Sequence, residues 1–347
     1  MKAAVLVGKE KIVVREVADP SPGRGEVLVA PKYAGICGTD VHVFQGEFEG
    51  RVKYPTILGH EFAGIVQAVG EGVRSFAEGD KVTVDPIIPC MRCAACREGN
   101  TSGCRSLKLL GVDLDGALAQ FVAVSEERVY KLPERVTVRD GAMVELFSIA
   151  VHACRRARLE PDDFVVVLGA GKLGLAILSV LKSTSAGTIG ITDVRDYRLD
   201  IARKIGVDYD VNAAKKDVVK EIMDITDGRG ADRVFEAVGH AEKTVSGLQP
   251  VGEAAEIVRH AGRVIVLGQG PVPESVFWRP FVWKEATLVA SRVTRGEFPR
   301  TISMLEKGAL DPAPLITHEV PIDFVPDAFR MIVEGREQAV KVIVKIE

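Results

Sequence analysis

Hydrophobic and polar positions follow two different patterns along the chain, and the pattern changes near Pro161. Before it, short apolar runs at residues 27–30, 65–69 and 81–84 are separated by glycine and proline, as is typical of β-strands joined by turns. After it, uninterrupted apolar runs alternate with segments of helical periodicity. Such alternation predicts βαβ units and a parallel sheet. The sequence therefore predicts a β-rich part followed by an α/β part.

The α/β part begins with Phe-Val-Val-Val-Leu at residues 164–168, an apolar run expected of a strand buried on both faces. Further strands are predicted at residues 188–192, 233–238 and 263–268, with a last strand at 340–346. The predicted helices lie between the strands of the parallel sheet and cover residues 172–182, 197–205, 218–225 and 251–259.

Length and composition narrow the classes of protein that the chain can represent. A length of 347 residues suggests about two domains. The net charge of −3, from 45 basic and 48 acidic residues, leaves no basic excess for binding nucleic acid. The apolar runs are far shorter than the ~18 residues that span a membrane, and the N-terminus lacks the pattern of a signal peptide. We therefore expect a cytoplasmic protein with reduced cysteines and with neither nucleic acid nor membrane as a partner.

Four of the six cysteines, namely Cys90, Cys93, Cys96 and Cys104, lie within one short segment. Two C-x-x-C steps and a closing loop can place four thiolates around one Zn²⁺, and a site filled by four thiolates is structural. An iron–sulfur cluster also takes four thiolates, but ferredoxin-like spacing normally adds a proline after the last cysteine, and Arg105 stands there. A third possibility is a group of incidental core cysteines. The spacing favours structural zinc.

A second set of metal-binding side chains is spread over two fragments. Cys37 follows Gly35-Ile36, and His60-Glu61 follows Gly59. A thiolate, an imidazole and a carboxylate suit a zinc ion that keeps an open position for chemistry. Neighbouring His60 and Glu61 reach one ion only if the backbone bends, and Gly59 permits that. The alternative is a buried structural cysteine and a hydrogen-bonded structural histidine.

The segment Gly169-Ala-Gly-Lys-Leu-Gly174 has the form G-x-G-x-x-G directly after a predicted buried strand and at the start of a predicted helix. In this position the pattern indicates dinucleotide binding, with the phosphates at the helix N-terminus. Asp193 at the end of the next strand can accept hydrogen bonds from a ribose and repel a 2′-phosphate, which favours NAD over NADP. Arg195 and Arg198 lie nearby and could accommodate such a phosphate. The alternative is a plain strand–helix turn without a ligand.

Taken together, Cys37, Gly59-His60-Glu61, the four-cysteine segment and the late glycine-rich turn resemble the zinc-dependent medium-chain dehydrogenases over essentially the whole chain. Residues 144–156 resemble the polyol (sorbitol-type) branch, although Leu146 and Phe147 replace its proline and leucine. Residues 38–42 and 192–199 resemble threonine 3-dehydrogenases, which usually have Gly-Asn where this chain has Ser148-Ile149. Residues 291–299 resemble sugar-acid (gulonate or galactonate) dehydrogenases.

The resemblance implies a fold, a site and an assembly. It implies a GroES-like β-barrel catalytic domain, residues 1–150 with 296–347, that carries both zinc sites, and an inserted Rossmann domain, residues 151–295, with a doubly wound parallel sheet. It implies a homo-oligomer, a tetramer or a dimer. The implied ligands of the catalytic zinc are Cys37, His60 and Glu145, with Glu61 as a ligand or close neighbour. The implied proton relay is Thr39 and His42. The expected contacts to NAD are Gly169, Gly171, Leu173, Gly174, Asp193, Arg198, Leu267 and Gly268.

From these residues we expect an enzyme with two Zn²⁺ per chain that moves a hydride from a secondary alcohol of a polyol or sugar acid to NAD⁺. L-Threonine 3-dehydrogenase is the alternative substrate assignment, and a non-enzymatic NAD(H) sensor is the alternative from another class. Arg292 and Arg295 could hold a substrate carboxylate, or lie on the surface or at a subunit contact. Structural or surface roles are assigned to the remaining histidines, His152, His240, His260 and His318.

Overall fold

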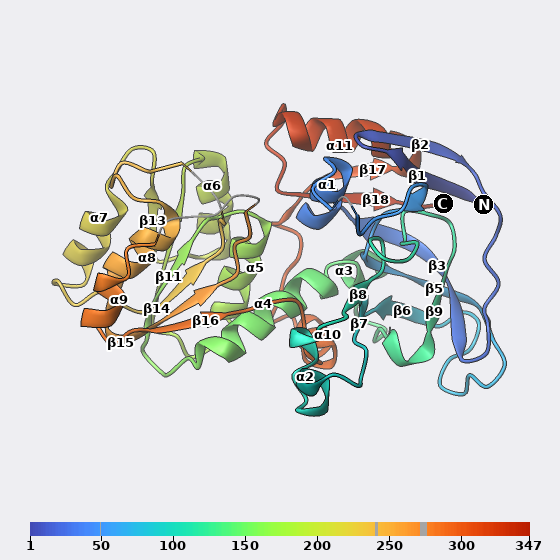
Figure 1. Ribbon diagram of the computed structural model, residues 1–347, viewed down its shortest axis with the longest axis horizontal. Helices are drawn as coiled ribbons and strands as arrows, with labels where there is room; N and C mark the ends of the chain where they lie inside the picture. Colours follow the sequence, from blue (N-terminus) through green and yellow to red (C-terminus); the bar gives the residue numbers. More distant parts are fainter. Residues whose placement is uncertain (49, 240–241, 271–275) are drawn as a thin grey trace. The chain divides into compact units, whose positions relative to one another are not determined.

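The computed structural model describes residues 1–48, 50–239, 242–270 and 276–347, so His240 lies outside the described residues. The chain divides into two compact units (Figure 1). The first unit combines Met1–Ser148 with Thr294–Glu347, and the second is Ile149–Val293. Both chain ends therefore belong to the first unit, and the second is continuous in sequence.

The first unit is built on short, mostly antiparallel strands. Its largest described sheet has the order β10-β6-β5-β3-β18-β17, with β9 also paired to β3. The strands of this sheet are β3 (Glu26–Gly35), β5 (Glu61–Val69), β6 (Lys81–Val84), β9 (Val122–Ser125), β10 (Val129–Lys131), β17 (Ile316–Pro321) and β18 (Lys341–Lys345). Smaller sheets contain β1 (Lys2–Gly8), β2 (Lys11–Glu16) and β4 (Thr56–Ile57), and β7 (Ile87–Ile88) and β8 (Lys108–Leu109).

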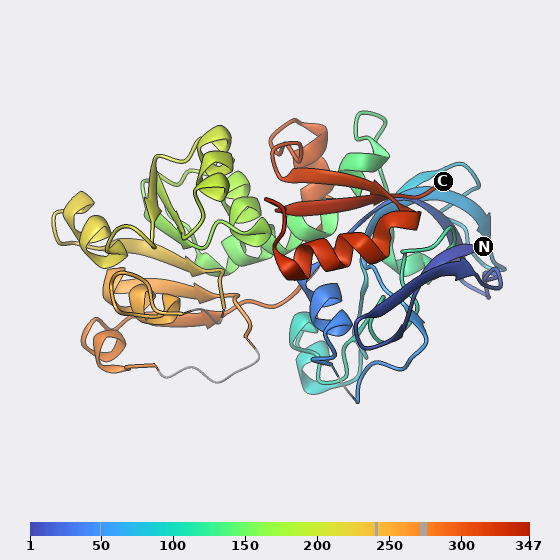
Figure 2. The ribbon, with the colours of Figure 1, turned by 90° about the horizontal axis from the view of Figure 1, so that it is seen from above.

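One strand from the end of the chain completes this sheet. β18 pairs antiparallel with β3, with Ile343 opposite Gly35 and Lys345 opposite Tyr33. Figure 2 shows β17 and β18, in red, lying side by side next to α11 (Val325–Glu334). The apolar centre of β18, Val342 to Val344, is buried, which explains why this segment is a central strand. Residues near the C-terminus thus share a sheet with the segment that leads to Cys37.

The other helices of the first unit are short, apart from α10. They are α1 (Gly38–Phe44), α2 (Ala94–Arg97), α3 (Val138–Gly141) and α10 (Phe298–Glu306), with 3-10 turns η1 (Thr101–Gly103), η2 (Glu126–Arg128) and η3 (Ile322–Phe324). Helix α4 (Val144–Ala157) starts in the first unit and continues into the second.

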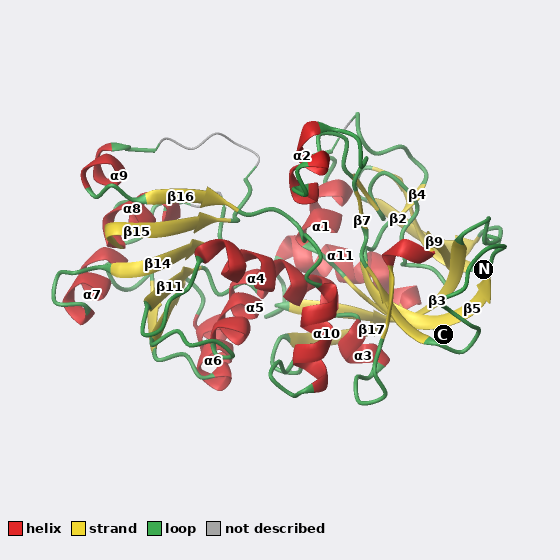
Figure 3. Ribbon diagram, turned by 90° about the horizontal axis from the view of Figure 1, so that it is seen from below, coloured by secondary structure: helices red, strands yellow, loops and turns green. Residues whose placement is uncertain are grey.

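The second unit contains a parallel sheet with the order β13-β12-β11-β14-β15-β16 in its described part. Numbered from the first strand, this is the order 3-2-1-4-5-6 of a doubly wound dinucleotide-binding fold. The strands are β11 (Phe164–Leu168), β12 (Thr188–Asp193), β13 (Tyr209–Asn212), β14 (Ala231–Glu236), β15 (Val258–Val266) and β16 (Thr287–Ala290). The helices lie on both faces of the sheet (Figure 3) and are α5 (Lys172–Leu181), α6 (Asp196–Ile205), α7 (Val218–Ile225), α8 (Pro250–Ile257) and α9 (Arg279–Trp283).

The predicted parallel sheet is confirmed, and its boundaries differ in detail. β11 is buried at every position, as its uninterrupted apolar run indicated. β14 and β15 begin earlier than predicted, and the helix predicted at 251–259 ends at Ile257 because β15 starts at Val258. The sequence did not indicate α4, β13 or β16; α4 and β13 mix polar and apolar positions, and β16 is a short strand of four residues.

Candidate functional site

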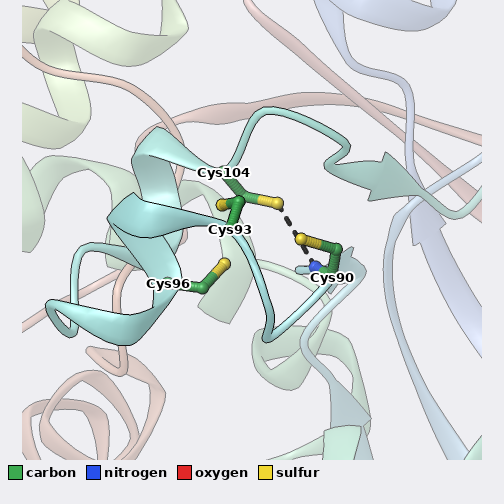
Figure 4. A group of neighbouring side chains, drawn as sticks. All are labelled: Cys90, Cys93, Cys96 and Cys104. Atoms are coloured by element: carbon green, nitrogen blue, oxygen red, sulfur yellow. Dashed lines mark hydrogen bonds between the residues drawn. The ribbon is translucent and has the colours of Figure 1, made fainter.

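The four clustered cysteines meet in the segment between β7 and β8. One sulfur atom from each lies within 4.8 Å of the others (Figure 4). Cys93 caps the N-terminus of α2, Cys96 lies within it, and Cys104 follows η1. The backbone N–H of Cys90 donates to Sγ of Cys104 at 3.2 Å. Four sulfur donors around one point fit tetrahedral Zn²⁺ and leave no position for a substrate.

The thiols of this cluster differ in acidity. Backbone N–H groups of Arg105 and Cys96 lower the pKa of Cys93 to about 6. Burial is the main cause that raises the pKa of Cys96 to about 12. A metal ion that binds all four sulfurs must therefore displace protons, so metal affinity at this cluster depends on pH.

Cys37, His60 and Glu61 form a second group, with one donor atom of each within 4.8 Å of the others. Cys37 lies between β3 and α1, His60 directly precedes β5, and Glu61 is the first residue of β5. Gly59 has a φ of 97°, in the region that favours glycine. A side chain at residue 59 would also meet Leu118, so the bend before His60 requires glycine.

Asp40, which the sequence analysis did not single out, contacts this group through its carboxylate. It is fully buried, and its carboxylate accepts the N–H of Cys37 at 2.8 Å and the N–H of Gly59 at 3.2 Å. Its Oδ1 lies 3.3 Å from Nδ1 of His60. Burial lowers the pKa of His60, but the negative charges of Asp40 and Cys37 outweigh this and raise it well above the usual value. A carboxylate at one ring nitrogen orients a histidine so that the other nitrogen can bind metal.

Lys341 is the second residue that the sequence analysis missed. Its ammonium group is fully buried against the carboxylate of Glu61, which is also fully buried. It donates to the carbonyl of Ile36 at 3.3 Å. Burial lowers the pKa of Lys341 to about 8, against the attraction of Cys37 and Asp40. A side chain at Gly35 would collide with the ends of both Lys341 and Glu61 and would displace this ion pair.

Glu145 was predicted as a ligand of the catalytic zinc, and Thr39 and His42 were predicted as a proton relay. All three belong to the first unit, as Cys37, His60 and Glu61 do. Glu145 is buried at the start of α4 and is not a member of the three-residue group found among the described residues. Thr39 and His42 are half-buried on α1, three positions apart and therefore on one face. Nδ1 of His42 lies 2.9 Å from the carboxylate of Glu47.

The glycine-rich turn joins β11 to α5 in the second unit. Gly169 has a φ of 95°, and the backbone at Gly171, which caps α5, faces open space. A side chain at Gly174 would collide with the carbonyl of Gly169, so the helix can approach the strand only with glycine there. These three environments are the ones that a dinucleotide-binding turn requires of its glycines.

A cavity of about 620 Å³ opens beside this turn. Gly169, Asp193 and Arg198 line it, whereas Gly171, Leu173, Gly174, Leu267 and Gly268 do not. The carboxylate of Asp193 accepts the N–H groups of Ala170 and Arg195, both at 2.9 Å, and the Arg198 guanidinium at 3.3 Å. Other lining residues that the sequence analysis did not identify are Ala213, Thr244, Val245, Pro250 and Glu253.

The two arginines considered for a substrate carboxylate have different surroundings. Arg292 is exposed in the second unit. Arg295 belongs to the first unit, and its guanidinium donates to Oδ1 of Asn100 at 3.2 Å. Of the histidines assigned to structure or surface, His152 is buried, His260 is exposed, and His318 lies 2.7 Å from Glu337.

Comparison with known proteins extends these observations. The model of the alcohol dehydrogenase GroES-like domain matches residues 23–134, and that of the zinc-binding dehydrogenase matches residues 173–307. Sorbitol dehydrogenase of Bacillus subtilis is 32% identical over 99% of this chain and 97% of the relative. L-Threonine 3-dehydrogenase of Pyrococcus abyssi is 35% identical over 99% and 98%. The 2-dehydro-3-deoxy-L-galactonate 5-dehydrogenase of Pseudoalteromonas atlantica is 33% identical over 99% and 98%.

Solved structures show the same fold. An alcohol dehydrogenase from Escherichia coli, complexed with NADH, superimposes with a TM-score of 0.91 at 32% identity, covering 99% of both chains. A zinc-binding dehydrogenase from Sinorhizobium meliloti, bound to NADP, gives a TM-score of 0.91 at 29% identity, covering 99% of this chain and 98% of that one.

The two-domain fold and the matches to both family models define a zinc-type alcohol dehydrogenase, and the chain has two clusters of side chains that could bind a metal ion. The chain belongs to the zinc-dependent medium-chain dehydrogenase family, with a GroES-like domain and a Rossmann-type domain for NAD(H). The family and the fold class predicted from the sequence are confirmed. Among the residues that the structure describes, no helix is long and apolar enough to cross a membrane.

Proposed function

We propose that the protein is an NAD-dependent dehydrogenase that oxidises a secondary hydroxyl of a polyol or sugar acid and holds two Zn²⁺ per chain. The observation that carries the proposal is the convergence of Cys37, His60 and Glu61, backed by the buried Asp40 and Lys341. A non-enzymatic NAD(H) sensor would need no such open donor set, so an enzyme fits this chain better.

The donor sets fit the two metal ions in different ways. The four sulfur atoms of the cysteine cluster would fill every position around one Zn²⁺. Metal binding at that site would stabilise the folded protein. One sulfur, one imidazole and one carboxylate leave a position open at the other. Glu145, at the start of α4 in the same unit, is proposed as a further ligand. We assign residues 1–150 with 296–347 to the catalytic domain and residues 151–295 to the NAD domain, which the two compact units support.

When bound, the metal acidifies a coordinated hydroxyl, as it lowers the pKa of water from about 15.7 to about 7, and the nicotinamide accepts the hydride. The chain's own residues position and deprotonate the alcohol. Asp40 orients His60, and Lys341 holds Glu61. Thr39 and His42, on one face of α1, are proposed to take up the hydroxyl proton and pass it to solvent. The alcohol loses that proton and a hydride, and the product is a ketone.

The choice of cofactor rests on Asp193. Its carboxylate lines the cavity of the second unit and is held by three donors, so its charge is fixed where a 2′-phosphate would lie. We propose contacts to NAD from Asp193 and Arg198 in the cavity wall and from the turn at Gly169, Gly171, Leu173 and Gly174. Leu267 and Gly268, which follow β15, are proposed as contacts farther along the cofactor.

The substrate is tested by comparing kcat/KM for sorbitol, an aldonate such as gulonate, L-threonine and ethanol, each with NAD⁺ and NADP⁺. The highest efficiency is expected with sorbitol or the aldonate and NAD⁺. The highest efficiency on L-threonine would instead support the second candidate, a threonine 3-dehydrogenase, to which the chain is 35% identical in one relative. The highest efficiency on ethanol would contradict the polyol assignment.

The metal site is tested with Cys37→Ser. Turnover should be lost while binding of NADH, measured by fluorescence titration, is retained, because the dinucleotide cavity lies in the second unit. Turnover that survives in this variant would show that the three-residue group is not the catalytic site.

A further inference from the structure

Four arginines come together beside the sheet of the second unit, where the end of α4 meets β14. Arg233 of β14 lies directly beside Arg263 of β15 in the parallel register. The Arg233 guanidinium donates to the carbonyl oxygen of Arg158, at 3.0 Å from Nη2 and at 3.3 Å from Nε. Arg156 lies two residues before Arg158, in the last turn of α4. We call Arg156, Arg158, Arg233 and Arg263 the arginine cluster.

Three members of the arginine cluster have no partner for their charge. Within the part of the chain that the structure describes, no hydrogen bond or ion pair joins the guanidinium groups of Arg156, Arg158 or Arg263 to an acceptor. Nε of Arg156 is also buried, and a buried donor without an acceptor is costly. Burial lowers the pKa of Arg263, and the positive charges of Arg158, Arg233 and Arg156 lower it further. The like charges therefore destabilise one another in the free protein.

The charges around the arginine cluster do not balance. Arg233 is buried and has two carboxylates nearby, that of Asp163 at 3.3 Å and that of Glu160 at 3.9 Å. Asp232 is the next residue in sequence, but it already has arginine partners outside the cluster. Two carboxylates and the C-terminal end of α4, which adds roughly half a negative charge, face four guanidinium groups, so roughly 1.5 positive charges remain uncompensated.

We propose that the arginine cluster binds a phosphate group, either free phosphate or the phosphate of a small metabolite. A phosphate group carries about 1.5 to 2 negative charges at pH 7, which matches the uncompensated charge, whereas a carboxylate carries only one. The planar fork of a guanidinium donates two parallel hydrogen bonds to phosphate oxygens. The buried Nε of Arg156 supplies a further donor.

This site is separate from the one proposed for the dinucleotide. Arg233 and Arg263 lie three residues before the ends of their strands, which are Glu236 in β14 and Val266 in β15. Three residues of a strand span about 10 Å. The dinucleotide cavity lies beside Gly169, at the carboxyl end of β11, and none of its described lining residues belongs to the arginine cluster. A phosphate group and a dinucleotide can therefore be bound together, and the proposal does not depend on the proposed reaction.

The first experiment measures binding by isothermal titration calorimetry of the full-length protein saturated with NADH, so that the dinucleotide cavity is occupied. Inorganic phosphate and glycerol 3-phosphate, a phosphate monoester, are titrated at a constant ionic strength set by chloride. Tighter binding of inorganic phosphate would identify the free ion as the ligand, and tighter binding of the ester would identify a metabolite. The absence of binding by both probes would overturn the proposal.

Arg263→Gln tests the arginine cluster itself. The loss of one charged donor should weaken binding of the phosphate probes by about tenfold or more. Arg203→Gln is the matched control, because Arg203 lies in the same unit but has its own partners, Asp200 and Asp210. The control should bind the probes as the wild type does. Equal affinity of the wild type and Arg263→Gln, or equal weakening in both variants, would contradict a site at the cluster.

The second experiment follows thermal unfolding by circular dichroism. Because the charges of the cluster repel one another, Arg263→Gln should unfold at no lower a temperature than the wild type in chloride alone. Phosphate at about one hundred times its dissociation constant should raise Tm of the wild type by roughly 5 °C, and that of the variant by about half as much. A lower Tm of Arg263→Gln without phosphate would show that the protein itself holds this arginine, and the proposal would then be wrong.

Discussion

The ion pair of Lys341 with Glu61 allows a quantitative test of how the proposed catalytic centre is held together. In Lys341→Met the chain keeps the volume of the side chain but leaves the Glu61 carboxylate buried without its cation. Removing one partner of a fully buried pair costs about 3–5 kcal/mol. At about 2–4 °C per kcal/mol for a protein of this size class, Tm of the metal-free protein should fall by roughly 6–20 °C.

The same substitution should strengthen the response to zinc. Without Lys341, Glu61 remains beside Cys37 and Asp40, so bound Zn²⁺ would replace the missing positive charge. Thermal unfolding followed by circular dichroism, with chelator or with added Zn²⁺, should therefore show a larger metal-induced rise in Tm for Lys341→Met than for the wild type. Lys341→Arg should restore much of the stability, because it keeps the charge.

Lys345→Met is the matched control. Lys345 lies on the same strand, and its partner Glu347 is exposed, so this change should leave Tm almost unchanged. The reasoning would be refuted if the variants at 341 and 345 lowered Tm equally, or if zinc stabilised Lys341→Met no more than the wild type.

Three further predictions concern other parts of the molecule. Cys93→Ser should reduce the zinc content, measured by elemental analysis, by one ion per chain and lower Tm, whereas Cys37→Ser should mainly abolish turnover. Asp193→Ser should raise the ratio of kcat/KM for NADP⁺ over NAD⁺ by about tenfold or more, because it removes a fixed negative charge and frees Arg198; an unchanged ratio would contradict this role. Burial raises the pKa of Asp85 to about 6. The protonated side chain therefore contributes fully to folding stability below about pH 4, and about 3 kcal/mol of that stability is lost as the pH rises through 6. Urea unfolding at pH 4 and 8 should show that Asp85→Asn reduces this loss.

The parts of the site that could be predicted are those in which neighbours in sequence are neighbours in space. The four cysteines lie within one loop, and the three glycines lie within one turn, so spacing alone indicated their contacts. Cys37 and His60 are brought together by β3 and β5, whose pairing could not be derived from the sequence, and they were identified by residue type and resemblance.

Asp40 and Lys341 could not be found in this way, for different reasons. Asp40 stands beside the polar residues Thr39 and His42, and its carboxylate is buried against Gly59 and His60, which are distant in sequence. Lys341 is one of two lysines that flank the apolar centre of β18, and it meets Glu61 because β18 joins β3. The sequence does not show which of the two lysines is buried.

The pairing of β18 with β3 also determines when the proposed catalytic centre can form during synthesis. The second unit is continuous and lies between the two pieces of the first, so all of its residues are made before residue 294. It can therefore fold while the first piece still lacks β18 and Lys341. Until then, Glu61 has no buried cation beside it, and the N-terminal strands of the first unit cannot close into their final sheet. The dinucleotide domain can thus mature first, and the proposed metal centre is completed only after Lys341 has been made.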